Sequence, residues 1–157
     1  MEEEASKNAK TFFSHLSASG EARMVRVSEK HEQKRTAVAE GFITLSGKTL
    51  ELLKARAIPK GDVLTLAKVA SIMAAKKTAE LIPLAHPIGL SFADTTFEIE
   101  EKGIRVVSTA ESVAKTGVEM EALVMVAIAV LTLYDMCKAV DQSMVIGPIK
   151  LLEKKKA

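Results

Sequence analysis

The chain has 157 residues, 48% of them hydrophobic, which is enough length and apolar content for one domain with its own core. Its net charge of +2, with no tryptophan and one tyrosine, gives no reason to expect nucleic-acid binding, which needs a basic surface interleaved with stacking aromatic residues. The single cysteine, Cys137, excludes an internal disulfide framework and a cysteine-based zinc motif.

The first residues, MEEEASKNAK, are acidic where a signal peptide would be positive, so we expect a cytoplasmic protein. The most apolar run, residues 122–133, is too short to span a membrane, and no membrane partner is expected.

Residues 1–23 are polar and predict a flexible N-terminal arm, followed by a single domain over residues 24–157. The roughly alternating segment RTAVAEGFITL predicts a strand over residues 35–45. Ser46 is an N-cap candidate for a helix over residues 46–57. Asp62 is an N-cap candidate for a second helix, which is expected to run to the break at Pro83.

Alternation on both sides of a Glu-Lys-Gly turn predicts a β-hairpin over residues 91–113. A long helix is expected over residues 117–140, and residues 144–154 predict a closing strand with a Gly-Pro interruption. This order of elements predicts an α+β sandwich with helices packed on one face of an antiparallel sheet.

The long helix has no charged residue over residues 122–131, where a helix lying on one face of a sheet should have a polar side. Either a second layer of the same chain or another subunit must cover it. In a domain this small, another subunit is favoured.

Polar residues flank this helix at both ends: Lys115, Glu119 and Glu121 near its start, Asp135 and Lys138 near its end. Asp135 and Lys138 are three residues apart and therefore on one helix face. They form either an ordinary surface ion pair or an acid–base couple, and the spacing alone favours the surface pair.

Several lysines, numbers 60, 76, 77, 115 and 138, either gather around a polyphosphate or form a solvated face, and the spacing leaves both open. His86 stands between Pro83 and Pro87; taken alone it is best explained as a turn residue, although rigid prolines also suit a ligand contact. Phosphate-loop and dinucleotide motifs are absent, and the three histidines lack metal-ligand spacing, so no metal site is expected.

Three segments occur in this order: GDVLTLAKVASIMAAKKTAELIPLAHP (61–87), KTGVEMEAL (115–123) and LTLYDMCKAV (131–140). They resemble the cyclic pyranopterin monophosphate synthase family of molybdenum cofactor biosynthesis, over about Met24 to Leu152. The resemblance implies a ferredoxin-like α+β sandwich and a hexamer made of dimers. It also implies conversion of 3′,8-cyclo-7,8-dihydroguanosine triphosphate into cyclic pyranopterin monophosphate and diphosphate, without a cofactor.

The resemblance also assigns residues. Asp135 is the catalytic aspartate, with Lys138 as its partner and Lys60 as a second proton-transfer lysine. Substrate contacts are implied for the turn Leu84, Ala85 and His86, for Glu119, Met120 and Glu121, and for the triphosphate-binding lysines Lys76 and Lys115. Lysines in a crowded cationic cluster are expected to have lowered pKa values.

This chain departs from the family pattern at Ala85, usually a cysteine, and at Arg26, usually an aspartate, and EKKKA replaces the usual Gly-rich tail. The Arg26 change favours an alternative function, a non-catalytic ferredoxin-like oligomer that binds nucleotide or RNA. The presence of Lys60, Asp135 and Lys138 favours the enzyme.

Glu121 and Asp135 are separated by fourteen residues, or about 21 Å along a helix. The resemblance nevertheless places both in one site. We therefore expect two subunits related by a two-fold axis to share each site at a dimer interface.

Overall fold

A computed structural model describes residues 14–157; residues 1–13, part of the expected arm, lie outside the described residues. In chain order the elements are β1 (Gln33–Thr44), α2 (Gly47–Lys54), α3 (Val63–Ala75), α4 (Thr78–Leu81), β2 (Phe92–Glu100), β3 (Gly103–Ala114), α5 (Glu119–Cys137), β4 (Val145–Ile146) and β5 (Lys150–Lys156).

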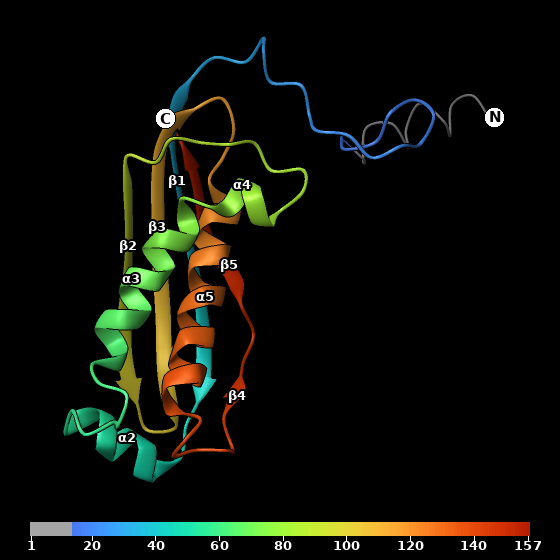
Figure 1. Ribbon diagram of the computed structural model, residues 1–157. Coiled ribbons are helices and arrows are strands. Elements are labelled where there is room, and N and C mark those ends of the chain that lie inside the picture. The colour runs from blue at the N-terminus through green and yellow to red at the C-terminus, as the bar shows by residue number, and fades with distance from the viewer. Residues whose placement is uncertain (1–13) are drawn as a thin grey trace.

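The sheet is antiparallel, with the strand order β2-β3-β1-β4, and β5 also pairs with β1. Helices α3 and α5 lie side by side on one face of it (Figure 1). The prediction of an α+β sandwich with helices on one face is confirmed, and the arrangement is consistent with a ferredoxin-like fold. The expected hairpin is formed by β2 and β3, and the expected first strand by β1.

The alternation of β1 sends every second side chain toward the helices, where Ala37, Ala39 and Ile43 are fully buried. Gly41 belongs to the same row. A Cβ added there would come within 2.6 Å of the Val126 Cγ1 on α5, so glycine allows the closest approach of helix and sheet.

The predicted helix starts are confirmed. The Ser46 hydroxyl accepts a hydrogen bond from the Thr49 amide at the start of α2, and the Asp62 carboxylate accepts one from the Thr65 amide at the start of α3. Helix α2 ends at Lys54, three residues before the expected end at residue 57. The cause is Arg56, whose φ of 52° lies in the left-handed region that ends helices.

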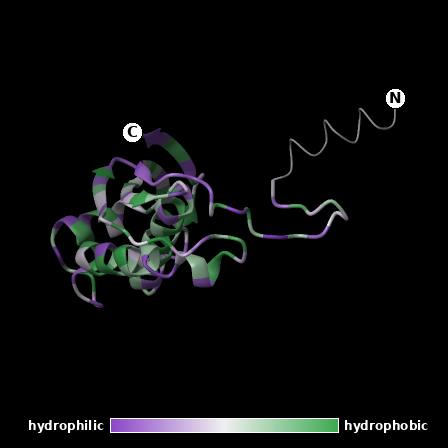
Figure 2. Cartoon of the chain, turned by 90° about the horizontal axis from the view of Figure 1, so that it is seen from above, coloured by the Kyte–Doolittle hydropathy of each residue, from purple (hydrophilic) through white to green (hydrophobic). Residues whose placement is uncertain are grey.

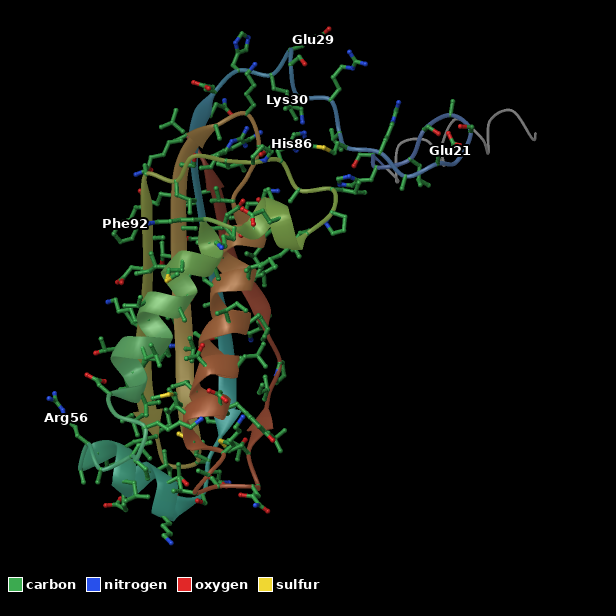
Figure 3. The ribbon with its side chains drawn as sticks, in the orientation of Figure 1. Glu21, Glu29, Lys30, Arg56, His86 and Phe92 are labelled. Atoms are coloured by element: carbon green, nitrogen blue, oxygen red, sulfur yellow. The ribbon has the colours of Figure 1, made fainter. Side chains whose placement is uncertain are left out.

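The prediction of one helix from Val63 to the Pro83 break is wrong. Helix α3 ends at Ala75, and α4 is a separate helix after the Lys76–Lys77 turn. The Thr78 hydroxyl donates to the carbonyl oxygens of Ala74 and Ala75, in competition with the helical backbone pattern. The turn that carries His86 lies beyond the end of α3 (Figure 3).

Helix α5 is long and apolar enough to cross a membrane by length and composition alone. Ten of its residues are nevertheless buried, among them Met125, Val126 and Leu133, because it packs against α3, β1 and β3. The chain therefore covers by itself much of the helix that was expected to need another subunit.

Exposed apolar residues instead lie on α3 and at the end of α5. Leu66, Val69 and Met73 follow one another at helical spacing on α3, and Leu131 lies on α5; between 47% and 56% of each is exposed. This surface is called the helix face below. Apolar patches of this kind are typical of interfaces.

A chain of buried hydroxyl groups joins α3 to the sheet. The Ser71 and Thr95 oxygens are 2.8 Å apart, as are those of Thr95 and Ser108, and all three residues are fully buried. Each hydroxyl finds a partner, so the core incurs no penalty for an unpaired polar group.

The segment before β1 leads away from the domain, as Figure 2 shows from above. Residues 14–23 of it form a small hairpin in which Leu16 and Ala22 are bridged and Gly20, with a φ of 83°, occupies the turn. Residues 24–32 then run back to the start of β1, along the end of the domain where α5 begins (Figure 1).

Candidate active site

The site residues expected from the sequence lie in two clusters, at the two ends of α5. The start of α5 carries Glu119 and Glu121, and its last turns carry Asp135, with Lys138 following as the C-cap. Helix α5 is 19 residues long, or about 28 Å at helical rise. We call the two groups the glutamate end and the aspartate end.

The glutamate end surrounds a cavity of about 480 Å³. Seven expected residues line it: Leu84, Ala85, His86, Lys115, Glu119, Met120 and Glu121. They come from the turn before β2 and from the stretch that joins the end of β3 to the start of α5, so the fold brings together two segments about thirty residues apart in the sequence.

His86 is positioned by a hydrogen bond of 2.7 Å between its Nε2 and the carbonyl oxygen of Val25. Because a carbonyl oxygen only accepts, Nε2 carries the proton and donates. The Lys115 ammonium donates similarly to the carbonyl oxygen of Ser28, at 2.9 Å. Two expected substrate-binding side chains therefore hold the segment before β1 over the cavity.

Glu121 is the buried acid of this cavity, with only 3% of the residue exposed. Burial raises the pKa of its carboxyl above the ordinary value, and the nearby Glu119 carboxylate raises it further. An acid whose pKa lies closer to neutrality is suited to exchanging protons with a substrate.

Glu119 is held by an ion pair with Lys154 on β5. Its side chain folds back over Gly117, where a Cβ would overlap the carboxylate group. Because Lys154 also lines the cavity, the last strand completes the wall of the glutamate end.

The aspartate end is an exposed triad. The Lys138 ammonium lies 2.7 Å from one Asp135 carboxylate oxygen, and the Lys60 ammonium lies 3.5 Å from the other and 2.8 Å from the Asp135 carbonyl oxygen. Lys60 comes from the turn between α2 and α3, so the structure joins residues that are 75 positions apart.

The expectation of a lowered lysine pKa is wrong for Lys138 in the single chain. Its hydrogen bond to Asp135 and the charge of that carboxylate raise the Lys138 pKa. The same contacts, helped by Lys60, lower the pKa of Asp135. The reason is exposure: the lysine gains an anionic partner but is not buried, so nothing removes water from its ammonium group.

Lys76 joins neither cluster. It is exposed at the end of α3 and is not among the residues that line the cavity of the glutamate end. Its position at the end of α3 does put it at the same end of the domain as the start of α5 (Figure 1).

Sequence reasoning missed three cations that line the cavity of the glutamate end: Lys30, Arg35 and Lys154. Arg35 and Lys154 lie on the paired strands β1 and β5. Strand pairing is what brings them there, and the only sequence signal was the basic character of residues 30–35 and 154–156. In the described part of the chain, no group of three or more His, Cys, Asp or Glu side chains is arranged to hold a metal ion.

The chain matches a known protein family over most of its length. A model of the MoaC family matches residues 24–157. The chain belongs to the MoaC family.

Relatives at about half identity cover nearly the whole chain. A protein of Clostridium perfringens (strain SM101 / Type A) is 52% identical over 142 residues, which are 89% of this chain and 90% of that protein. One from Nitratidesulfovibrio vulgaris is 49% identical over 144 residues (90% and 89%), and one from Novosphingobium aromaticivorans is 49% identical over 141 residues (90% and 90%). All three are named cyclic pyranopterin monophosphate synthase.

Two of the residues expected to depart from the family pattern have defined places in the structure. Ala85 lines the cavity of the glutamate end. Arg26 is exposed on the segment that crosses this cavity and lines a neighbouring one.

Proposed function

We propose that the protein is a cyclic pyranopterin monophosphate synthase, a lyase of molybdenum cofactor biosynthesis. Its substrate is (8S)-3′,8-cyclo-7,8-dihydroguanosine 5′-triphosphate, and its products are cyclic pyranopterin monophosphate and diphosphate. Family membership and the shared name of relatives at about half identity support this assignment. The buried free Cys137 fits a reducing compartment, so we place the reaction in the cytoplasm.

The observation that carries the mechanism is the separation of the two clusters. A substrate of nucleotide size cannot touch both ends of a helix about 28 Å long through short side chains. We infer that the glutamate end of one subunit meets the aspartate end of its two-fold partner, so that a dimer holds two equivalent sites. The exposed apolar helix face supports association, and three such dimers would form the hexamer.

Each cluster then has its own task. Lys115, with Lys30, Arg35 and Lys154 around the cavity, balances the triphosphate charge, and Lys76 approaches from the end of α3. Lys60 and Lys138 exchange protons, while Asp135 orients both ammonium groups. Glu121 supplies a carboxyl whose burial makes it a weaker acid.

The chemistry matches these groups. The reaction rearranges the cyclised purine to a pterin and closes a cyclic phosphate as diphosphate leaves. Atoms and electrons balance without an external oxidant, so proton transfer and charge stabilisation are the work required of the side chains.

Turnover tests the assignment. The protein is incubated with the cyclised triphosphate, the product is oxidised, and pterin fluorescence is measured. Product formation that disappears in Lys60→Ala and Lys138→Ala, with unchanged circular dichroism, supports the enzyme. Tight substrate binding without product would instead support the non-catalytic nucleotide-binding oligomer.

A mixing experiment tests the shared site. Glu121→Gln and Asp135→Ala are each expected to be inactive, yet a mixed dimer has one doubly altered site and one intact site. Random exchange yields mixed dimers in about half of the population, so about a quarter of wild-type turnover should return. The matched control mixes Asp135→Ala with Lys138→Ala, which lie at the same end and should restore nothing. Proven subunit exchange without recovery in the first mixture would refute the shared site.

A further inference from the structure

A strap, defined here as residues Arg23–Ser28, crosses the cavity of the glutamate end. Its side chains alternate: Val25 and Val27 are half-buried and line that cavity, whereas Met24, Arg26 and Ser28 are exposed. Two hydrogen bonds from the domain hold it, one from His86 to the Val25 carbonyl oxygen and one from Lys115 to the Ser28 carbonyl oxygen. The inward side of the strap is therefore apolar, and its outward side is free to bind something else.

The strap also lines a second, neighbouring cavity, of about 500 Å³. The lining includes Arg23, Arg26, Ser14, Ser28 and the His86 ring, and it contains no aspartate or glutamate. Within residues 14–157 neither arginine side chain has an ion-pair or hydrogen-bond partner. The nearest acid in sequence, Glu21, instead accepts a hydrogen bond from Ser19 in the hairpin turn.

Arg23 and Arg26 share one cavity, whereas Arg56, also unpaired within residues 14–157, lines a different one and the other two arginines have partners. Arg105 is paired with Glu40 and Glu98, and Arg35 donates to the carbonyl oxygens of Ala114 and Lys115. Guanidinium groups bind phosphate oxygens in a bidentate manner, and serine hydroxyls add further donors. A cavity with these groups and no carboxylate favours a compact polyanion over a neutral or cationic ligand.

We propose that the strap cavity is an anion-binding site for a diphosphate group, with Arg23 and Arg26 as its ligands. It shares Ser14, Val25, Val27 and His86 with the cavity of the glutamate end, so a ligand there is next to the proposed substrate site. The diphosphate is either the distal part of a bound triphosphate or the released product. That identification rests on the proposed function, whereas binding of a diphosphate does not.

Inorganic pyrophosphate is the probe, titrated calorimetrically into the wild type, Arg23→Gln and Arg26→Gln. The control is Arg56→Gln, which removes the same charge from the opposite end of the domain to His86 (Figure 3). Each strap variant should bind pyrophosphate about tenfold to a hundredfold more weakly, and the control should stay within about twofold of wild type. Equal weakening in all three variants, or no weakening in the strap variants, overturns the proposal.

Kinetics then separate the two sources of diphosphate. If the site holds the distal triphosphate, Arg26→Gln raises KM for the cyclised substrate. If it holds released product, the variant weakens inhibition by pyrophosphate and leaves KM unchanged. A protein that binds pyrophosphate through the strap but never turns over substrate would refute the proposed function and leave this site standing. Normal turnover with wild-type pyrophosphate binding in both strap variants would refute only the site.

Discussion

Replacing Gly117 with alanine should lower turnover while leaving the stability of the fold nearly unchanged. Gly117 lies just before α5, and the Glu119 side chain folds back over it. A Cβ built on Gly117 would lie 2.6 Å from the Glu119 Cδ. Two non-bonded carbon atoms do not come this close. The Glu119 carboxylate must therefore move, and its ion pair with Lys154 must break.

The expected changes differ in size. The Glu119–Lys154 pair is partly exposed, so its loss lowers the free energy of unfolding by at most about 1 kcal/mol. Removing a glycine from the unfolded chain offsets this by about 0.4–1 kcal/mol. The free energy of unfolding should thus stay within about 1 kcal/mol of wild type. Turnover should fall about 10- to 100-fold, since a charged contact contributes about 1.5–3 kcal/mol.

Urea unfolding and steady-state turnover measure the two effects on the same preparation. Gly47→Ala is the matched control, because a Cβ at Gly47 meets nothing within 4 Å. Turnover of Gly117→Ala equal to that of the control would show that the position of the Glu119 carboxylate is unimportant, and would refute the reasoning. A large loss of stability would refute it too, because the overlap would then extend beyond one flexible side chain.

Three further predictions concern buried groups. Glu121→Gln should abolish turnover and raise the free energy of unfolding at pH 8. Burial raises the pKa of the Glu121 carboxyl, so its ionisation destabilises the fold as the pH rises above about 4. Urea midpoints of the variant and the wild type should converge at low pH. Asp141→Ala should lower the free energy of unfolding by about 3–5 kcal/mol, because the carboxylate accepts hydrogen bonds from the Ser46 amide and from the Ser143 amide and hydroxyl. Burial of the Asp141 carboxyl opposes ionisation, but these hydrogen bonds outweigh it and lower the Asp141 pKa. The stabilisation is therefore present above about pH 4 and is lost as the pH falls through the lowered pKa. A difference in unfolding free energy between variant and wild type that does not shrink in acid would contradict this. Cys137→Ser should leave turnover within about twofold of wild type, since burial raises the pKa of the Cys137 thiol to about 11 and leaves it unreactive; lost turnover with an unchanged circular dichroism spectrum would contradict this.

The elements with strong local signals were predictable from the sequence. Alternation identified β1 and the β2–β3 hairpin, a long and almost uncharged apolar run identified α5, and the side chains of Ser46 and Asp62 marked the starts of α2 and α3. These features depend on neighbouring residues alone, so the pattern is enough to predict them.

The break after Ala75 was not predictable in this way. Lys76 and Lys77 are good helix formers, and only the hydrogen bonds of the Thr78 hydroxyl to the preceding turn reveal the competing conformation. The left-handed Arg56 is a similar case, since the sequence pattern favours glycine at such a position.

The site was predictable to different degrees. The residues at the two ends of α5 came from the family resemblance, because spacing alone favoured a surface pair for Asp135 and Lys138. Lys154 was missed because its meeting with Glu119 depends on β5 pairing with β1 beside the start of α5. Such a contact between distant segments leaves no local pattern in the sequence.

In the shared site proposed above, the pKa directions at the two ends of α5 would explain why each site needs two subunits. Proton exchange needs groups whose pKa values lie near the working pH. In the single chain, the solvent-exposed pairing of Lys138 with Asp135 instead lowers the pKa of Asp135 and raises that of Lys138. In the shared site proposed here, the apolar surroundings of Glu121 and the cations around it would cover that exposed pair. Removing water from the Lys138 ammonium, and placing further cations beside it, both lower its pKa. Assembly would therefore lower the pKa of Lys138 toward neutral pH. Burial already raises the pKa of the Glu121 carboxyl in the direction of neutral pH.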